Sequence, residues 1–478
     1  MPLRRLREPP AWLPALNPFA LAGRAIHGFR PSSAPPLSRV NFRRELVASA
    51  FLPWAIAIIE GGILGVIVRR YFQPLVDAGE MPSTALNFAV ALVTASPAFA
   101  NISSFLFVRL AHGKHKVRAV TALQIVMAIL ASSIAFAPQS RLGLVFVLAA
   151  GISARMCYAG IVTLRSAVWR ANYPRHTRAR LTGRIAAIQT LCTAGVGLLI
   201  GAVLEFDERN IRFLVPSVVA VSLVGVWWWR RIRMRGHAAL LRAEREAHDT
   251  DRPSFNPARL VSILIDDPKY AAFMGVQFFM GMGNMMTFAV IVIMTQEVFD
   301  LGYRDAMLAT QVIPYLMIPV LVGPWSALLD RWHITKYRAL HTWAFVLMAV
   351  VLFLAARYEI AALLFLASAI RGAGFAGGAI AWNLGHNDFA RDDNAAQYMA
   401  VHVTLTGIRG LFAPFLGVAI YEWFESIEPG GGAWLFAICA VQLTLGAFGF
   451  LALSKFVFSD TPPEEPAAPT AARPATRS

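Results

Sequence analysis

Residues 46–68 read LVASAFLPWAIAIIEGGILGVIV, an apolar run that contains a single ionisable side chain, Glu60. A helix needs about 20 apolar residues to cross the roughly 30 Å of hydrocarbon in a bilayer. This run meets that length. In lipid, the backbone N–H and C=O groups must form hydrogen bonds within the segment, which favours a helix over irregular loops or open sheet edges. We therefore predict that this segment spans a membrane as an α-helix.

Similar runs recur along the whole chain and lack the two-residue alternation of barrel strands. They predict an all-α membrane protein with twelve transmembrane helices, arranged as two pseudo-symmetric six-helix bundles. The predicted spans are 46–68, 83–107, 117–136, 142–169, 181–204, 213–229, 270–294, 306–329, 339–356, 360–384, 399–423 and 434–456.

The composition of the 478 residues agrees with this prediction. Hydrophobic residues make up 57% and charged residues only 15%, too few to cover a watery surface. The net charge is +16, but the basic residues are dispersed between the apolar runs, so we expect no nucleic-acid partner. The chain contains no phosphate-binding loop, hydrolase motif or paired-cysteine metal motif. We expect no enzyme activity, no cofactor and no metal.

The spans divide the chain into five segments. They are a basic cytoplasmic arm (1–45), a first six-helix half (46–230), a cytoplasmic central loop (231–269), a second six-helix half (270–457) and a disordered cytoplasmic tail (458–478). The loops on the side of the two termini are rich in Lys and Arg, whereas the opposite loops carry acids such as Glu205, Asp207 and Glu428. Basic loops stay in the cytoplasm. We expect a multi-pass protein of the inner cell membrane with both termini cytoplasmic.

An internal repeat relates the two halves. Residues 155–160 (RMCYAG) of the fourth span line up with residues 372–377 (GAGFAG) of the tenth, so that Arg371 falls one position from Arg155. Repeated halves are common in secondary transporters.

Two loops complete the pattern. Residues 326–338 (SALLDRWHITKYR) contain an Asp330-Arg331 pair followed by further basic residues, while 110–118 (LAHGKHKVR) has His112 at the position of the acid. With six plus six spans, these loops make the chain resemble the major facilitator superfamily, whose loops read Gly-x-x-x-Asp-Arg-x-Gly-Arg-Arg. The resemblance implies alternating access, a central cavity lined by spans one, four, seven and ten, and a gating role for Asp330 and Arg331.

Ionisable residues within the spans are candidates for the site, because a charge at mid-membrane costs at least about 2.5–3.5 kcal/mol without a partner or a wet cavity. The resemblance places Glu60, Arg155 and Arg371 around one cavity, to which the seventh span adds Gln277 and Asn284. We expect Glu60 to couple proton binding to transport. We expect the other four to bind substrate, unless Glu60 and Arg155 form a structural ion pair.

Two more polar residues lie in the eleventh span, which need not face the cavity. The sequence does not decide between functional and structural roles for Arg409 and His402. We expect a structural role for Arg409, and we expect a neighbouring group to satisfy His402.

Two arginines against one carboxylate favour an anionic or zwitterionic small solute, because guanidinium groups bind carboxylates and phosphates bidentately. We therefore expect a monomeric secondary transporter in contact with membrane lipids, driven by a gradient of protons or of a solute. The alternatives are a proton-driven exporter of lipophilic compounds and a polytopic sensor or assembly protein that transports nothing.

Overall fold

The computed structural model describes residues 29–246, 257–390 and 395–457, and these residues form helices joined by short loops. The first 28 residues of the predicted arm, part of the central loop and the predicted tail lie outside the described residues. The helices are α2 (Arg39–Phe51), α3 (Pro53–Ile58), α4 (Gly61–Tyr71), α5 (Gln73–Asp77), α6 (Ser83–Leu110), α7 (Lys116–Ser133), α8 (Arg141–Asn172), α9 (Arg175–Phe206), α10 (Ile211–Trp229), α11 (His237–Glu246), α12 (Pro257–Asp266), α13 (Pro268–Glu297), α14 (Tyr303–Met307), α15 (Ile313–Leu329), α16 (Ile334–Arg357), α17 (Ala361–Leu384), α18 (Ala395–Ile427) and α19 (Trp434–Ala452).

The described residues contain twelve stretches long and apolar enough to cross a membrane, which confirms the predicted fold class. The first span combines α2, α3, α4 and α5, and the eighth combines α14 and α15. The other ten are α6, α7, α8, α9, α10, α13, α16, α17, α18 and α19.

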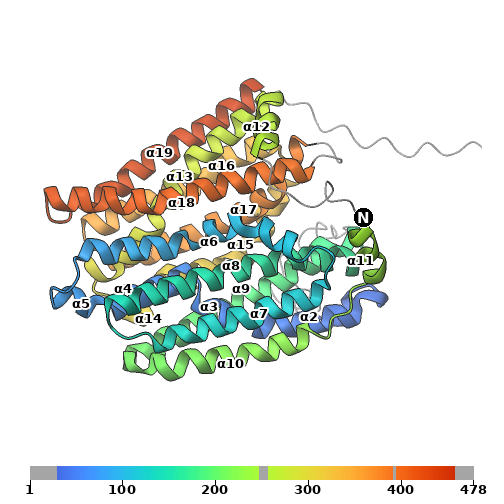
Figure 1. Cartoon of the computed structure of the whole chain (residues 1–478). Coiled ribbons are helices and arrows are strands. Elements are labelled where there is room, and N and C mark those ends of the chain that lie inside the picture. The colour runs from blue at the N-terminus through green and yellow to red at the C-terminus, as the bar shows by residue number, and fades with distance from the viewer. Residues whose placement is uncertain (1–28, 247–256, 391–394, 458–478) are drawn as a thin grey trace, which may run out of the picture.

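The spans form two bundles that lie against each other. In Figure 1 the blue-to-green helices of the first half fill the lower part of the molecule, and the orange and red helices of the second half fill the upper part. The halves meet along two seams. At one seam α6 packs against α18 and α13, and at the other α9 packs against α14 and α15.

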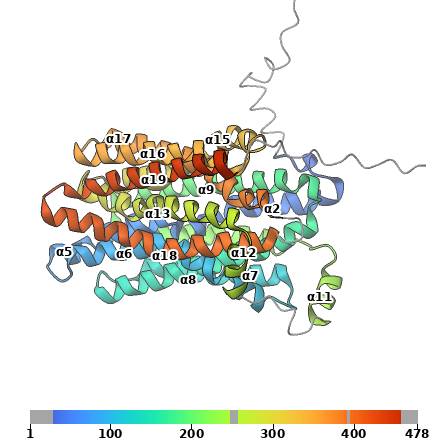
Figure 2. The same ribbon diagram turned by 90° about the horizontal axis from the view of Figure 1, so that it is seen from above.

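The two ends of the bundle differ in charge, and we name them by that difference. The basic side carries the loops 111–115, 173–174, 230–236 and 330–333 together with α11 and α12, and lies on the right in Figures 1 and 2. The acidic side carries α5 and the loops 298–302 and 428–430, and lies on the left. The cavity and its seal are described relative to these sides.

The first span is broken in its middle, which its sequence pattern did not predict. Its helix begins at Arg39, within the segment assigned to the arm, and is interrupted between α3 and α4 at Glu60, whose backbone is extended (φ −70°, ψ 133°). Gly61 and Gly62 follow directly, and glycine is a poor helix former. The break places the carboxylate of Glu60 beside the start of a new helix.

The eighth span also departs from a regular helix, with a π-helical turn at Leu308–Val312 between α14 and α15. Pro314 follows this turn and has no N–H group, so it cannot donate to the carbonyl of Thr310 four residues earlier. That carbonyl accepts a hydrogen bond from Arg371 Nη1 of α17 instead (3.3 Å). Thr310 Oγ1 donates to the carbonyl of Gly62 (3.1 Å), which joins the irregular turn to the break in the first span.

The loop between α6 and α7, which has His112 in place of the expected aspartate, contacts a carboxylate from another segment. Glu244 of α11 accepts hydrogen bonds from the Gly113 N–H and from Lys116 Nζ, each at 2.7 Å. This contact fastens the described part of the central loop to the basic side of the first half.

Candidate functional site

A cavity of about 610 Å³ lies between the two halves, in the part of the spans nearer the basic side. The first half lines it with α3, α8 and α9, and the second half lines it with α13, α15, α16, α17 and α18. Its lining runs from Glu60 at mid-span to Asn383, near the basic end of α17. A solute inside the cavity would therefore contact both halves.

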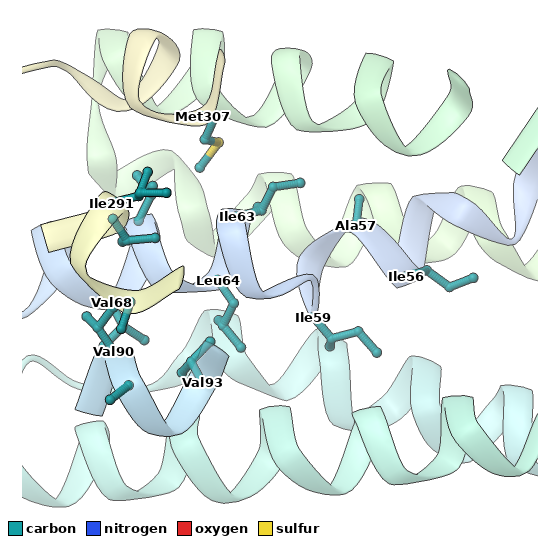
Figure 3. Close-up of a cluster of buried hydrophobic side chains, with 14 of the residues drawn as sticks. Ile56, Ala57, Ile59, Ile63, Leu64, Val68, Val90, Val93, Ile291 and Met307 are labelled. Atoms are coloured by element: carbon teal, nitrogen blue, oxygen red, sulfur yellow. The ribbon is translucent and has the colours of Figure 1, made fainter. Parts of the chain in front are cut away.

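A layer of apolar side chains lies between Glu60 and the acidic side, and Figure 3 shows members of this layer within a larger buried cluster. The side chains of this layer come from α4, α6, α13 and α14, and each is at most 2% exposed. They include Ile63, Leu64, Val68, Val90, Val93, Ile291 and Met307. Because both halves contribute, the layer closes the space between them on that side.

Polar contacts centred on Glu297 of α13 lie beyond the apolar layer. Its Oε1 accepts from Arg69 Nη2 (2.7 Å) and Asn87 Nδ2 (2.9 Å) of the first half, and its Oε2 accepts from the Tyr421 hydroxyl (2.9 Å). Asn87 Nδ2 also donates to Glu422 of α18 (2.5 Å). These contacts tie the halves together at the acidic side, so the structure is a state closed there, with its cavity toward the basic side.

The predicted partners Glu60 and Arg155 meet at the floor of the cavity. Arg155 Nη1 lies 2.6 Å from Glu60 Oε1, and the two side chains are only 13% and 11% exposed, in the order Arg155 and Glu60. Glu60 lines the cavity, whereas Arg155 lies behind the wall with its guanidinium over the Tyr158 ring. The ion pair expected as the structural alternative is thus present, and proton coupling through Glu60 stays a prediction.

Arg371 is not among the residues that line the cavity. Besides its bond to the Thr310 carbonyl, its guanidinium carbon lies 5.1 Å from the ring centre of Phe288 and 5.0 Å from that of Phe375. Both rings line the cavity, and Arg371 lies behind them. Substrate binding by Arg155 and Arg371 therefore stays a prediction, and in this conformation neither residue lines the cavity.

Gln277 and Asn284 of α13 both line the cavity, where the sequence placed them. The side-chain oxygens Gln277 Oε1 and Asn284 Oδ1 are buried and have no hydrogen-bond partner among the described residues. Each is therefore available to accept a hydrogen bond from a solute or a water molecule.

Three arginines that the sequence analysis did not assign to the cavity line it. Arg165 of α8, Arg338 of α16 and Arg409 of α18 are 6%, 3% and 5% exposed, and each has a buried Nε with no hydrogen-bond partner among the described residues. Among the residues that line the cavity, the acidic one is Glu60, and its charge is already balanced by the ion pair with Arg155. The cavity therefore has an excess of positive charge.

Arg409 shows that the eleventh span faces the cavity, which the sequence left open, and its structural role stays a prediction. Its Nη1 donates to the Gln277 carbonyl (2.6 Å), and its guanidinium lies where a side chain at Gly281 would be, since an added Cβ would approach Cζ to 2.2 Å. His402 is fully buried beside the Trp382 ring, and neither of its ring nitrogens has a hydrogen-bond partner among the described residues. The neighbour expected to satisfy His402 is therefore not seen there.

Helical spacing could have identified Arg165. Tyr158, Val162 and Arg165 follow Arg155 at intervals of three and four residues, which places all four on one face of α8. No comparable signal exists for Arg338, which the sequence assigned to the loop before the ninth span.

The predicted gating residues lie at the basic side. Asp330 and Arg331 lie in the loop that follows α15, where Arg331 is exposed. The anchor of this loop is Asp388, which follows α17 and accepts a hydrogen bond from the Ile334 N–H (2.7 Å) at the start of α16. Burial lowers the pKa of His333 in the same loop and outweighs the opposing effect of Asp388, so we expect this imidazole to be neutral at pH 7. The gating role of Asp330 and Arg331 stays a prediction.

Sequence comparison identifies the class of protein. The profile of the Major Facilitator Superfamily matches residues 46–414, so the chain belongs to that superfamily. It is therefore a multi-pass membrane transporter and not an enzyme. No curated protein matches the chain by sequence.

Solved structures confirm the fold. A mutant form of the nucleoside transporter NupG aligns with a TM-score of 0.64 at 14% identity, over 87% of this chain and 100% of its own. A D-xylose–proton symporter aligns with a TM-score of 0.64 at 14% identity, over 87% of this chain and 97% of its own. A POT family transporter in complex with a thioalcohol-conjugated peptide aligns with a TM-score of 0.62 at 14% identity, over 89% of this chain and 99% of its own.

Proposed function

We propose that this secondary transporter carries a small organic anion, or a zwitterion bound through its anionic group, by alternating access. The excess of positive charge in the cavity supports this proposal most directly. Arg165 from the first half and Arg338 and Arg409 from the second half face the same space, and their unpartnered Nε groups are donors for carboxylate or phosphate oxygens. A lipophilic cation would meet unfavourable charge there.

A ligand-binding measurement on purified protein tests this proposal. Hydrogen bonds to charged groups contribute about 1.5–3 kcal/mol, so Arg409→Gln should weaken binding of the best anion by about 10- to 150-fold. Arg357→Gln removes the same charge from the exposed end of α16 and should leave affinity unchanged. The screen should pair carboxylates and phosphates with amines and neutral compounds of equal size. Preferential binding of the amines or neutral compounds would contradict an anionic substrate and favour an exporter of lipophilic compounds.

A proton carried by Glu60 is the second part of the proposal. The carboxylate lies at the break in the first span, at the cavity floor, and its partner Arg155 belongs to a different helix of the same half. Protonation of Glu60 would end the ion pair and leave Arg155 free to contact the anionic group of a solute. Substrate and proton would thus bind to linked sites, which is the requirement for coupling.

The orientation is proposed from charge, with the basic side in the cytoplasm and the protein, as a monomer, in the inner membrane of the cell. Single cysteines at Asp207 and Glu428 should react with an impermeant thiol reagent in intact cells, and cysteines at Arg242 and Lys336 should react only after the cells are opened. A Cys192→Ser background removes the half-buried natural thiol. The reverse pattern of labelling would invert the orientation.

A further inference from the structure

We infer that the basic side of the first half contains a binding site for the headgroup of an anionic phospholipid. The site is a surface pocket of about 360 Å³ between the start of α2 and the segment that follows α10, and it is separate from the transport cavity. Its lining consists of Val40, Asn41, Arg44, Arg233, Met234 and Arg235. In Figure 1 α2 and α10 lie together along the lower edge of the molecule.

The backbone of this pocket is held by specific hydrogen bonds. Asn41 Nδ2 donates to the carbonyl of Arg233 (2.8 Å), and its Oδ1 accepts from the N–H of the same residue (3.2 Å). Asn172 Oδ1 accepts from the Arg235 N–H (3.1 Å). The three lining arginines are therefore presented on a fixed frame and do not depend on a loose loop for their positions.

The charge of the pocket favours an anion. Each guanidinium has five N–H donors. Arg44 donates one hydrogen bond to the carbonyl of Arg231, and Arg235 donates one to the carbonyl of Leu37. Most of the donors of both arginines therefore remain available. The nearest acid in the sequence, Glu45, is 2% exposed and accepts hydrogen bonds from Trp169 and Tyr173 on the inner side of α2. Its carboxylate therefore does not neutralise the pocket.

The position of the pocket favours a lipid over a soluble anion. Arg44 lies two residues before the apolar run that begins at Leu46, and Arg233 lies four residues after α10 ends at Trp229, so both arginines are at the boundary between hydrocarbon and water. Leu223, Val224 and Trp227 of α10 are exposed by 46%, 41% and 39%, and acyl chains would lie along this face. Basic pockets at this depth on the cytoplasmic side suit anionic headgroups.

Native mass spectrometry of the purified full-length protein tests the site. The probes are a phosphatidylglycerol, a phosphatidylcholine with the same acyl chains, and glycerol phosphate as the soluble headgroup. We expect saturable binding of the phosphatidylglycerol at least about fivefold tighter than of the phosphatidylcholine. Equal affinity for the two lipids would overturn the inference, and so would equally tight binding of glycerol phosphate, which would indicate a site for free anions.

Variants locate the binding. Arg233→Gln removes a guanidinium that makes no hydrogen bond among the described residues, so the frame formed by its backbone should persist. This single variant should weaken phosphatidylglycerol binding about fivefold, because each arginine near an anionic surface contributes about 1 kcal/mol. The double variant that combines Arg44→Gln and Arg233→Gln should weaken it about 25-fold. Arg118→Gln, an exposed arginine of α7 on the same side, is the control and should leave binding unchanged. Equal weakening by the control, or none by the double variant, would overturn the site.

Discussion

Replacing Glu60 with glutamine is expected to abolish uphill accumulation of substrate. Glutamine neither gains nor loses a proton, and it leaves Arg155 without its partner at 2.6 Å in a largely buried position. Removing one member of a buried ion pair costs about 3–5 kcal/mol, so the yield of folded protein should also fall. Accumulation in proteoliposomes under an imposed pH gradient measures the first effect, and size-exclusion chromatography measures the second.

The double variant Glu60→Gln with Arg155→Gln separates these two effects. Removing both charges leaves no uncompensated ion, so folded protein should recover toward the natural level. Uphill accumulation should remain absent, because no group at this position titrates. If either variant accumulates substrate with the natural pH dependence, Glu60 does not carry the coupled proton.

Replacing Gly201 with valine is expected to stop transport by preventing closure of the acidic side. A Cβ at Gly201 would lie 2.9 Å from Arg304 Cα and 3.2 Å from the Tyr303 carbonyl oxygen, both across the seam in the second half. Since the first contact is with backbone, the halves must separate to relieve it. Overpacking costs about 1–3 kcal/mol, enough to lower the closed population by about 5- to 150-fold.

A cysteine at Val90 reports this closure, because the side chain is fully buried in the apolar layer of Figure 3. We expect an aqueous thiol reagent added from the acidic side to label Val90→Cys quickly in the Gly201→Val background and slowly without it. Gly195→Val is the matched control on the same helix, since a Cβ there meets nothing within 4 Å. Slow labelling and normal transport in Gly201→Val would show that this contact does not limit closure.

The spans were predictable because hydrocarbon imposes a length and a composition on every crossing segment. The contact between Glu60 and Arg155 was also predictable, since a carboxylate and a guanidinium within apolar spans each require a partner. Gln277 and Asn284 were located correctly from the resemblance to the superfamily, because that resemblance assigned the seventh span to the cavity.

The remaining features depend on tertiary contacts that sequence spacing does not encode. Arg409 reaches the cavity because Gly281 of a distant helix leaves room for its guanidinium. Arg371 is held behind Phe288 and Phe375 because Pro314, on yet another helix, releases the carbonyl of Thr310. In both cases the position of an arginine is set by a residue without charge in another span.

The break at Glu60 divides the first span into two helical parts that pack on different partners. The first part, α3, packs mainly on α9 and α10 of its own half, whereas α4 also packs on α13 and α14 of the other half. When the halves separate on the acidic side, α4 must leave α13 and α14, while α3 keeps its contacts within the first half. The helix is already interrupted at Glu60, so this movement need not break a helical hydrogen bond. The residue proposed to exchange the proton therefore lies at the point about which α3 and α4 would move relative to each other.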